Sequence, residues 1–467
     1  MAEKGSRCMS HRILIVSTTT GYQTRSFGEA AERLGIQLVF ATDRCHHIDD
    51  PWRDAAVPIR FHDEDASVRA VIEASRSQPI HGVIAVGDRP TRIAALVAEA
   101  LGLPGHPPRA AEICRNKLAT RECLTSAGLP APAFRAVPLN ADPRALACEV
   151  SFPCVVKPLA LSGSRGVIRA NDRTEFVEAF ERLHRLLSQA SIRAMRDPAH
   201  DSIIVEAFVA GRECALEGLV ERGRLRTLAL FDKPDPLDGP FFEETIYVTP
   251  SSLALDRQQE IHDAVGRAIA AMGLRHGPVH AECRINLESW GPCPHEAPRV
   301  RGPRRPTPLV AARDGVVVLE VAARPIGGLC AKALRFQHGA GELISLEELL
   351  LRHALGESTD HLSRESRASG VMMVPIPSRG MYRRVEGADE AAAVPGIEEV
   401  RITAKPDQRL VPLPEGASYL GFIFAGRNTA DEVVQALRAA HAKLHFVIEK
   451  EVIVKEQRVM STESRAT

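Results

Sequence analysis

The 467-residue chain has no excess of charge of either sign, which argues against one large class of partners. Lysine and arginine together number 59, aspartate and glutamate also number 59, and the formal net charge at pH 7 is zero. Proteins dedicated to nucleic acid usually carry a basic surface, because neutralising phosphates supplies much of their binding free energy. We therefore expect no nucleic acid partner.

Long apolar segments are also absent. A run of roughly 18 apolar residues, the length typical of a membrane-spanning helix, does not occur. The apolar run at 12–17 is too short for the core of a signal peptide, and no small-residue cleavage site follows it. The cysteines form no C-x-x-C pair and mostly lie in apolar segments, which favours buried free thiols. These features predict a cytoplasmic protein without a membrane partner.

Two common nucleotide-binding motifs are missing as well. The P-loop pattern G-x-x-x-x-G-K-[ST] does not occur anywhere in the chain. The first expected strand, 12–17, continues into Ser-Thr-Thr-Thr-Gly instead of the dinucleotide pattern G-x-G-x-x-G. A nucleotide site in this protein would therefore have to use other residues.

The first hundred residues alternate between strand and helix patterns. Strands are expected at residues 12–17, 36–41 and 82–86. Helices are expected between and after them, at residues 27–34, 67–75 and 91–101. This order predicts a parallel sheet covered on both faces, with any ligand at the carboxyl ends of its strands. The expected fold class is α/β, with a Rossmann-like N-terminal domain.

Further along, the proline-rich stretch 103–108 marks the first domain boundary, and a change of pattern near Gly370 marks a C-terminal unit. Alternating strand and helix patterns continue between these two points. The segment 290–308 is rich in proline and arginine, which predicts a loop or disordered insertion outside the core.

Lys157 ends an apolar strand and precedes the small-residue loop 162–167 (SGSRGV). Backbone N–H groups can approach phosphate oxygens closely where side chains are small, and a lysine adds a positive charge. The segment is therefore a candidate phosphate clamp. A hairpin turn with a solvated lysine is the structural alternative.

Glutamates recur in the apolar segments that follow. Glu206, Glu213 and Glu217 lie within 205–217, and the last two are expected on one face of a strand because their separation is even. Buried acids need a cation, a metal or hydroxyl donors. A salt-bridged face of a sheet is the structural alternative.

Glu282 and Glu320 each occur within a hydrophobic strand pattern. If these two strands lie side by side, the two carboxylates converge on one point, and such hard oxygen ligands suit Mg²⁺. Arg324 is close enough in sequence to Glu320 to reach the same cluster. Its structural alternative is an ion pair with one of these glutamates.

Taken in order, these residues resemble the ATP-grasp superfamily. The resemblance covers roughly 110–345 and rests on Asn116-Lys117, Lys157 with its loop, the E-x6-E-x3-E run, His-Ala-Glu at 280–282 and the segment EVAARPIGG at 320–328. The pattern is most similar to carboxylate–amine ligases of the L-amino-acid ligase, or dipeptide synthetase, type. The segments 231–244 and 421–426 support that branch.

The resemblance implies three domains. Residues 1–108 would form the N-terminal α/β domain and residues 109–355 an ATP-grasp domain of two α+β subdomains. Within the latter, 109–205 would include the small lid subdomain, and 206–355 would form the large one with a flexible insertion at 290–310. Residues 356–467 would form a C-terminal lid subdomain.

It also implies roles in nucleotide binding. Lys117 and Lys157 would contact the phosphates of ATP, and a mobile loop would close over them through Ser162, Gly163, Ser164 and Gly166. Glu206, Ala207 and Phe208 would line the adenine slot, and Glu213 would accept hydrogen bonds from the ribose.

For the reaction itself, the resemblance implies Glu282 and Glu320 as ligands of Mg²⁺, with Mn²⁺ as a second option. Arg324 would hold the carboxylate and the acyl phosphate, and Lys157 would assist. His280 is a further catalytic candidate that orients a substrate or relays a proton, although a core histidine bonded to a backbone carbonyl fits equally. Ala322 replaces an asparagine found in many members, which leaves the number of metal ions open.

We therefore expect an ADP-forming ligase that makes an acyl phosphate and then an amide or peptide bond. A small carboxylate and an amine, with amino acids first among them, would be its substrates. A homodimer is common among related folds. The alternatives are a biotin-carboxylase-like or purine-biosynthesis-like enzyme of the same superfamily, and a catalytically silent nucleotide-binding protein.

Overall fold

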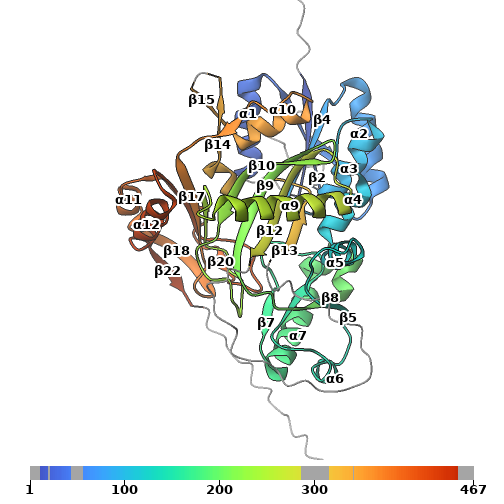
Figure 1. Ribbon diagram of the computed structural model, residues 1–467, viewed down its shortest axis with the longest axis vertical. Helices are drawn as coiled ribbons and strands as arrows, with labels where there is room; N and C mark the ends of the chain where they lie inside the picture. Colours follow the sequence, from blue (N-terminus) through green and yellow to red (C-terminus); the bar gives the residue numbers. More distant parts are fainter. Residues whose placement is uncertain (1–10, 19–21, 44–55, 286–314, 340, 451–467) are drawn as a thin grey trace, which may run out of the picture.

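The computed structural model describes residues 11–18, 22–43, 56–285, 315–339 and 341–450 (Figure 1). The insertion expected at 290–310 lies outside these residues. So do three of the cysteines, namely Cys8, Cys45 and Cys293. Of the helices in the described ranges, none has the length and apolar character needed to cross a membrane.

The N-terminal domain contains a parallel sheet, as predicted, and its strand order is β3-β2-β1-β4. Its elements in chain order are β1 (Arg12–Ser17), α1 (Tyr22–Leu34), β2 (Gln37–Thr42), β3 (Ala56–Pro58), α2 (Glu64–Ser77), β4 (Gly82–Val86) and α3 (Thr91–Ala100). Strand β3 was not predicted, because three residues are too few to show an alternating pattern.

Strand β1 shows why this sheet needs cover on both faces. Ile13 and Ile15 belong to one hydrophobic cluster, whereas Leu14 and Val16 belong to another. Successive side chains on a strand point to opposite faces, so a continuous apolar run fills two cores. The first of these cores also contains residues of the central sheet, which ties the N-terminal domain to the rest of the molecule.

The next part of the chain forms a small subdomain with an antiparallel sheet of order β5-β8-β6-β7. Its elements are α4 (Pro108–Arg115), α5 (Lys117–Ser126), β5 (Phe134–Pro138), α6 (Pro143–Leu146), β6 (Cys154–Pro158), β7 (Ile168–Ala170), α7 (Arg173–Leu187), α8 (Ala190–Arg193), η1 (Pro198–Asp201) and β8 (Ser202–Ala207). Asn116 separates helix α4 from helix α5. Its side chain accepts hydrogen bonds from the N–H groups of Leu118 and Ala119, so it caps α5 and places Lys117 at the first helical position.

An eight-stranded sheet of order β13-β12-β9-β10-β11-β17-β21-β19 forms the centre of the molecule. The elements of its first half are β9 (Arg212–Glu221), β10 (Arg224–Asp232), β11 (Ile246–Thr249), α9 (Leu255–Met272), β12 (Gly277–Ile285) and β13 (Val316–Ala322). Helix α9 lies across one face of these strands (Figure 1). Ile261, Val265 and Ile269 recur at helical spacing on it and are fully buried in the core beneath.

The C-terminal residues continue this same sheet through β17, β21 and β19. The remaining elements are η2 (Cys330–Ala333), β14 (Arg335–His338), β15 (Glu342–Ser345), α10 (Leu346–Ala354), β16 (Ser363–Arg364), β17 (Ala368–Val374), β18 (Gly380–Glu386), α11 (Ala388–Ala392), β19 (Ile397–Ile402), β20 (Arg409–Leu410), β21 (Gly421–Arg427), α12 (Ala430–His441) and β22 (His445–Glu449). Strand β17 pairs with β11 on one side and with β21 on the other. The unit expected from 356 onward therefore shares a hydrogen-bonded sheet with the residues before it.

The N-terminal sheet touches helix α10 at a point where only glycine fits. A Cβ atom added to Gly82 would lie 2.7 Å from the carbonyl oxygen of Ala354 and 3.1 Å from its Cβ. The backbones of β4 and the end of α10 could not approach this closely with a larger residue at position 82.

Replacing this glycine should therefore loosen the contact. We expect Gly82→Ala to lower the free energy of unfolding by about 1–3 kcal/mol, because an extra methyl group would force the two backbones apart. Gly266→Ala in α9 is the matched control, since nothing lies within 4 Å of the added Cβ, and it should be neutral or stabilising by up to about 1 kcal/mol. Urea unfolding followed by circular dichroism distinguishes the two. Equal midpoints for both variants would contradict this account of the contact.

Candidate active site

A cavity of about 500 Å³ lies where the N-terminal domain, the small subdomain and the central sheet meet. Nearly all of the residues that the sequence singled out line it, namely Lys117, Lys157, Ser162, Gly163, Ser164, Glu206, Ala207, Phe208, Glu213, His280, Glu282, Glu320 and Arg324. Gly166 of the small-residue loop does not line the cavity. Segments distant in sequence thus bring lysines, glutamates and an arginine to one cavity.

Lys157 lies at the end of β6 and forms a buried ion pair with Glu206 of the neighbouring strand β8. Its Nζ is 2.6 Å from Oε2 of Glu206, and Nε of the fully buried Arg121 is 2.9 Å from Oε1. Burial lowers the pKa of Lys157. Burial alone would raise the pKa of Glu206, but Arg121 and Lys157 hold it below its ordinary value. The two cations and one carboxylate leave a net positive charge at this wall of the cavity.

Lys117 connects the small subdomain to strand β13. Its Nζ lies 3.4 Å from Oε2 of Glu320 and donates a hydrogen bond of 2.9 Å to the carbonyl of Leu161. The backbone N–H of Lys117 donates a hydrogen bond to the carbonyl of Leu159. The ammonium group is thereby held between a cavity carboxylate and the start of the small-residue loop.

The loop 162–167 adopts a backbone that suits small residues. Gly163, Ser164 and Gly166 all have positive φ, the left-handed region that glycine adopts at little cost. The N–H of Gly166 donates to the carbonyl of Pro414, and Nε of Arg165 donates to the carbonyl of Glu415, both at 2.8 Å. Residues of the C-terminal part therefore hold this loop beside the cavity.

Glu282 and Glu320 lie directly opposite each other on the antiparallel strands β12 and β13. Opposite residues on paired strands place their side chains on the same face. The two carboxylates are 26% and 28% exposed, so they can accept a ligand from the cavity. The expectation that the two strands lie side by side is confirmed.

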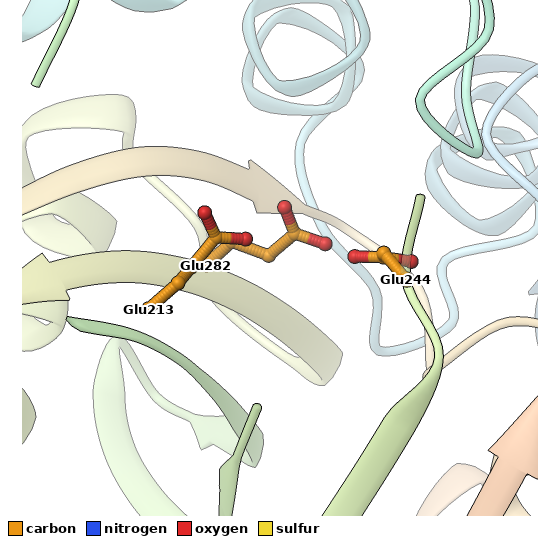
Figure 2. Close-up of side chains that lie close together, drawn as sticks. All are labelled: Glu213, Glu244 and Glu282. Atoms are coloured by element: carbon orange, nitrogen blue, oxygen red, sulfur yellow. The ribbon is translucent and has the colours of Figure 1, made fainter. Parts of the chain in front are cut away.

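Glu282 also belongs to a second group of carboxylates, with Glu213 and Glu244. One oxygen from each of the three lies within 4.8 Å of the others, and Figure 2 shows the carboxylates pointing toward one another. Nζ of Lys233 lies 2.8 Å from Glu213, 2.6 Å from Glu244 and 3.5 Å from Glu282. Burial would lower the pKa of Lys233, but the three carboxylates raise it well above its ordinary value. This group of acids therefore contains its own cation.

His280 lies beside Glu282 on β12, and glutamates surround it. Its Nδ1 is 3.1 Å from Oε2 of the fully buried Glu217, and its Nε2 is 3.8 Å from Glu282. Burial would lower the pKa of His280, but the two carboxylates raise it to about 9. Glu217 also accepts a hydrogen bond from the N–H of Ile326. The ring is thus an oriented imidazolium, and its partners are carboxylates instead of the backbone carbonyl considered from the sequence.

Glu213 and Phe208 belong to a wall with both charged and apolar parts. Nε of Arg284 donates to Glu213 at 2.9 Å, and its guanidinium carbon lies 5.1 Å from the ring centroid of Phe208. The rings of Phe208 and Phe242 are 6.5 Å apart, and Val155 packs in the same small cluster. A flat aromatic group could be sandwiched along this wall beside a buried carboxylate.

Arg324 follows β13 and forms a two-pronged ion pair with Asp88, which follows β4 in the N-terminal domain. Nε to Oδ1 is 2.7 Å and Nη2 to Oδ2 is 2.9 Å. The sequence had suggested a glutamate as its structural partner, and the structure gives an aspartate from another domain. Burial opposes ionisation of both groups, yet each keeps the other charged, so the pKa of Asp88 is lowered and that of Arg324 is raised.

Sequence reasoning assigned no role to Lys233, although it lies in the segment 231–244. Lys233 directly follows the apolar strand β10, and Lys157 lies near the end of the apolar strand β6; this similar position was the signal that could have revealed Lys233. Tyr247, which donates a hydrogen bond to Glu244, carried no recognisable pattern.

Models of three protein families match successive parts of the chain. An ATP-grasp N-terminal domain matches residues 28–105, an ATP-grasp domain matches 150–300, and an L-amino acid ligase C-terminal domain matches 372–449. Together the three matches extend from the N-terminal sheet to the last described strand.

Similarities to individual proteins and to a solved structure extend over parts or nearly all of the chain. An uncharacterized protein of Sinorhizobium fredii is 26% identical over 91% of this chain and 81% of its own length. Alanine–anticapsin ligase of Bacillus subtilis is 28% identical over 41% of this chain, which spans only 42% of that enzyme. The crystal structure of an L-amino acid ligase from Bacillus licheniformis superposes with a TM-score of 0.74 at 27% identity, covering 95% of this chain and all of that one.

The position of Lys233 gives a prediction about stability. We expect Lys233→Met to lower the free energy of unfolding by about 3–5 kcal/mol, because it leaves buried carboxylates without their shared cation. Lys332→Met is the matched control. It breaks a half-exposed pair with Glu399 and should cost at most about 1 kcal/mol. Urea titrations of both variants at neutral pH measure the difference, and losses of similar size would show that Lys233 does not neutralise the cluster.

Proposed function

We propose that this chain, which belongs to the ATP-grasp superfamily and is similar to L-amino acid ligases, is an ATP-dependent carboxylate–amine ligase that releases ADP and phosphate. The observation that carries the proposal is the meeting of Lys117 and Lys157, the opposed pair Glu282 and Glu320, and Arg324 around one cavity. Phosphate, metal and carboxylate ligands are all available at this one place.

The nucleotide would occupy the side of the cavity formed by the small subdomain. Lys117 and Lys157 would contact the phosphates, and the loop with Ser162, Gly163, Ser164 and Gly166 would cover them. Glu206, Ala207 and Phe208, with the apolar side chains beside them, would form the adenine slot. Glu213 would accept the ribose hydroxyls, since Lys233 and Arg284 hold its oxygens in place and leave lone pairs free.

The glutamate pair fits a divalent cation. Glu282 and Glu320 offer hard oxygen donors from opposed positions, and both are open to the cavity, which suits Mg²⁺ or Mn²⁺. When bound, such an ion would neutralise phosphate charge and polarise the transferring group. Ala322 adds no donor to β13, so these two carboxylates would be the ligands that the two strands supply.

The reaction would proceed in two steps. A carboxylate oxygen attacks the γ-phosphorus of ATP, ADP leaves, and Lys117 and Lys157 neutralise charge on the phosphoryl group. The amine then attacks the acyl carbon, the amine proton is lost, and phosphate leaves as the amide forms. Arg324 would stabilise the developing oxyanion, and His280, held by Glu217, would keep the neighbouring groups oriented. Most of the rate enhancement would come from positioning and electrostatics.

Amino acids are the substrates that the match over 372–449 favours, because that domain type is named for amino acid ligation. The same match ranks a biotin-carboxylase-like or purine-biosynthesis-like activity lower. The complete set of charged residues argues against a catalytically silent protein. A cytoplasmic location and a homodimer remain part of the proposal, and light scattering on the purified protein tests the latter.

The direct test is phosphate release by the purified protein with Mg-ATP and pairs of amino acids or small amines. We expect release that requires both substrates, with ADP and a product whose mass equals the sum of the two less one water. Mass spectrometry identifies the product. Formation of AMP, or no release with any pair in a broad panel, would contradict the proposal.

A variant tests the metal assignment. Glu320→Gln keeps the shape of the side chain but removes the charge of one metal ligand. We expect turnover to fall by about a hundredfold or more, because a bound ion contributes several kcal/mol to the barrier. Glu399→Gln, whose carboxylate pairs with Lys332 and Arg401 away from the cavity, should retain full turnover. Full activity of Glu320→Gln would remove this residue from the site.

A further inference from the structure

We infer that Asp88 recognises the α-ammonium group of an amino-acid substrate, and that this substrate opens the Asp88–Arg324 ion pair by replacing both of its charges. The inference rests on the proposed ligase function and adds to it the residue that selects an α-amino acid over a simple carboxylic acid. It rests on where the pair lies and on the exchange of charges that an α-amino acid allows at this pair.

The pair joins two domains at the wall of the cavity. Asp88 lies in the loop after β4, at the carboxyl end of the parallel sheet, where ligands of such sheets bind. Its side chain is 23% exposed, and that of Arg324 is 11% exposed. In the described part of the N-terminal domain, Gln23, Gly87 and Asp88 reach the cavity, and of these only Asp88 is ionisable.

Asp88 occupies the side of the Arg324 guanidinium that Nε and Nη2 form. Both of these atoms donate to Asp88, and Nη1 of Arg324 donates to the carbonyl of Pro325 at 3.0 Å. A guanidinium binds carboxylate or phosphate best through two parallel hydrogen bonds. If Arg324 is to hold the substrate carboxylate through Nε and Nη2, Asp88 must give up at least one of its two contacts.

Releasing Asp88 has a cost that only some substrates can offset. A largely buried carboxylate that loses its cation is destabilised unless another cation replaces it. The charged groups facing Asp88 are Arg324, Lys117 and His280. Lys117 already pairs with Glu320, and His280 with Glu217 and Glu282, so neither is free to replace Arg324.

An α-amino acid supplies both missing charges. Its carboxylate can take the place of Asp88 on Arg324, while its ammonium group takes the place of Arg324 on Asp88. Every buried charge then keeps a partner. A carboxylic acid without the amino group would pair with Arg324 but leave Asp88 alone, so the site should discriminate against it.

The test compares each L-amino acid with its deaminated analogue, such as L-leucine with 4-methylpentanoate and L-phenylalanine with 3-phenylpropionate. Binding to the full chain is measured by calorimetry with Mg²⁺ and a non-hydrolysable ATP analogue, so that the result does not depend on turnover. We expect the wild type to bind the amino acid about 10- to 100-fold more tightly, the range expected for a hydrogen-bonded charge pair.

Asp88→Asn should remove this preference and bring the two dissociation constants within about threefold of each other, while binding of the nucleotide analogue stays unchanged. Asp65→Asn removes the same charge from an exposed position on α2 and should retain the preference. If Asp88 only positions Arg324, Asp88→Asn will instead weaken the amino acid and its analogue equally, which would overturn the inference.

The wild-type comparison can still contradict the inference if Asp88→Asn does not fold. Equal binding of the amino acid and its analogue by the wild type would also overturn the inference. Phosphate release is measured in parallel. Preferential amino-acid binding without phosphate release supports the recognition role of Asp88 and contradicts the ligase function. Phosphate release without a binding preference supports the ligase function and contradicts the recognition role.

Discussion

Buried carboxylates dominate the centre of this molecule, and each needs a cation that the fold must bring to it. The sequence supplies these cations from distant segments. Glu206 pairs with Lys157 and Arg121, Glu213 with Lys233 and Arg284, Glu217 with His280, and Asp88 with Arg324. An unpaired charge at any of these positions would cost several kcal/mol. The requirement for pairing therefore fixes the relative placement of the strands, the small subdomain and the N-terminal loop.

The parts of the structure that were predictable from the sequence are those that depend on neighbouring residues and not on pairing between distant ones. Strand and helix patterns are local, so β1, β2, β4 and α3 follow from residue spacing. The opposition of Glu282 and Glu320 follows because both lie in apolar strands adjacent in chain order. The order of strands across a sheet depends on contacts between distant residues, so the continuation of the central sheet into β17 and β21 had no local signal.

The partners of charged residues were the least predictable feature of the candidate site. The structural alternative for Arg324 was an ion pair with a glutamate nearby in sequence, yet its partner is Asp88, which lies 236 residues earlier. Lys233 was overlooked because a lysine after an apolar run usually lies in solvent. It is buried here because three carboxylates, from β9, β12 and the approach to β11, converge on it. A sequence shows which side chains are ionisable, whereas the fold decides which of them share a charge.

The shared eight-stranded sheet has a mechanical consequence. Strands β11 and β17 are joined by a ladder of hydrogen bonds, so the C-terminal residues and the first half of the sheet form one stiff body. The small subdomain shares no strand with that body in the described residues, and the loop 162–167 touches it through Pro414 and Glu415. Opening the cavity would therefore move the small subdomain as a unit against this body. That motion would break the contacts of the loop with Pro414 and Glu415, the ion pair of Arg182 with Glu415 and the bridge between Ile168 and Phe241.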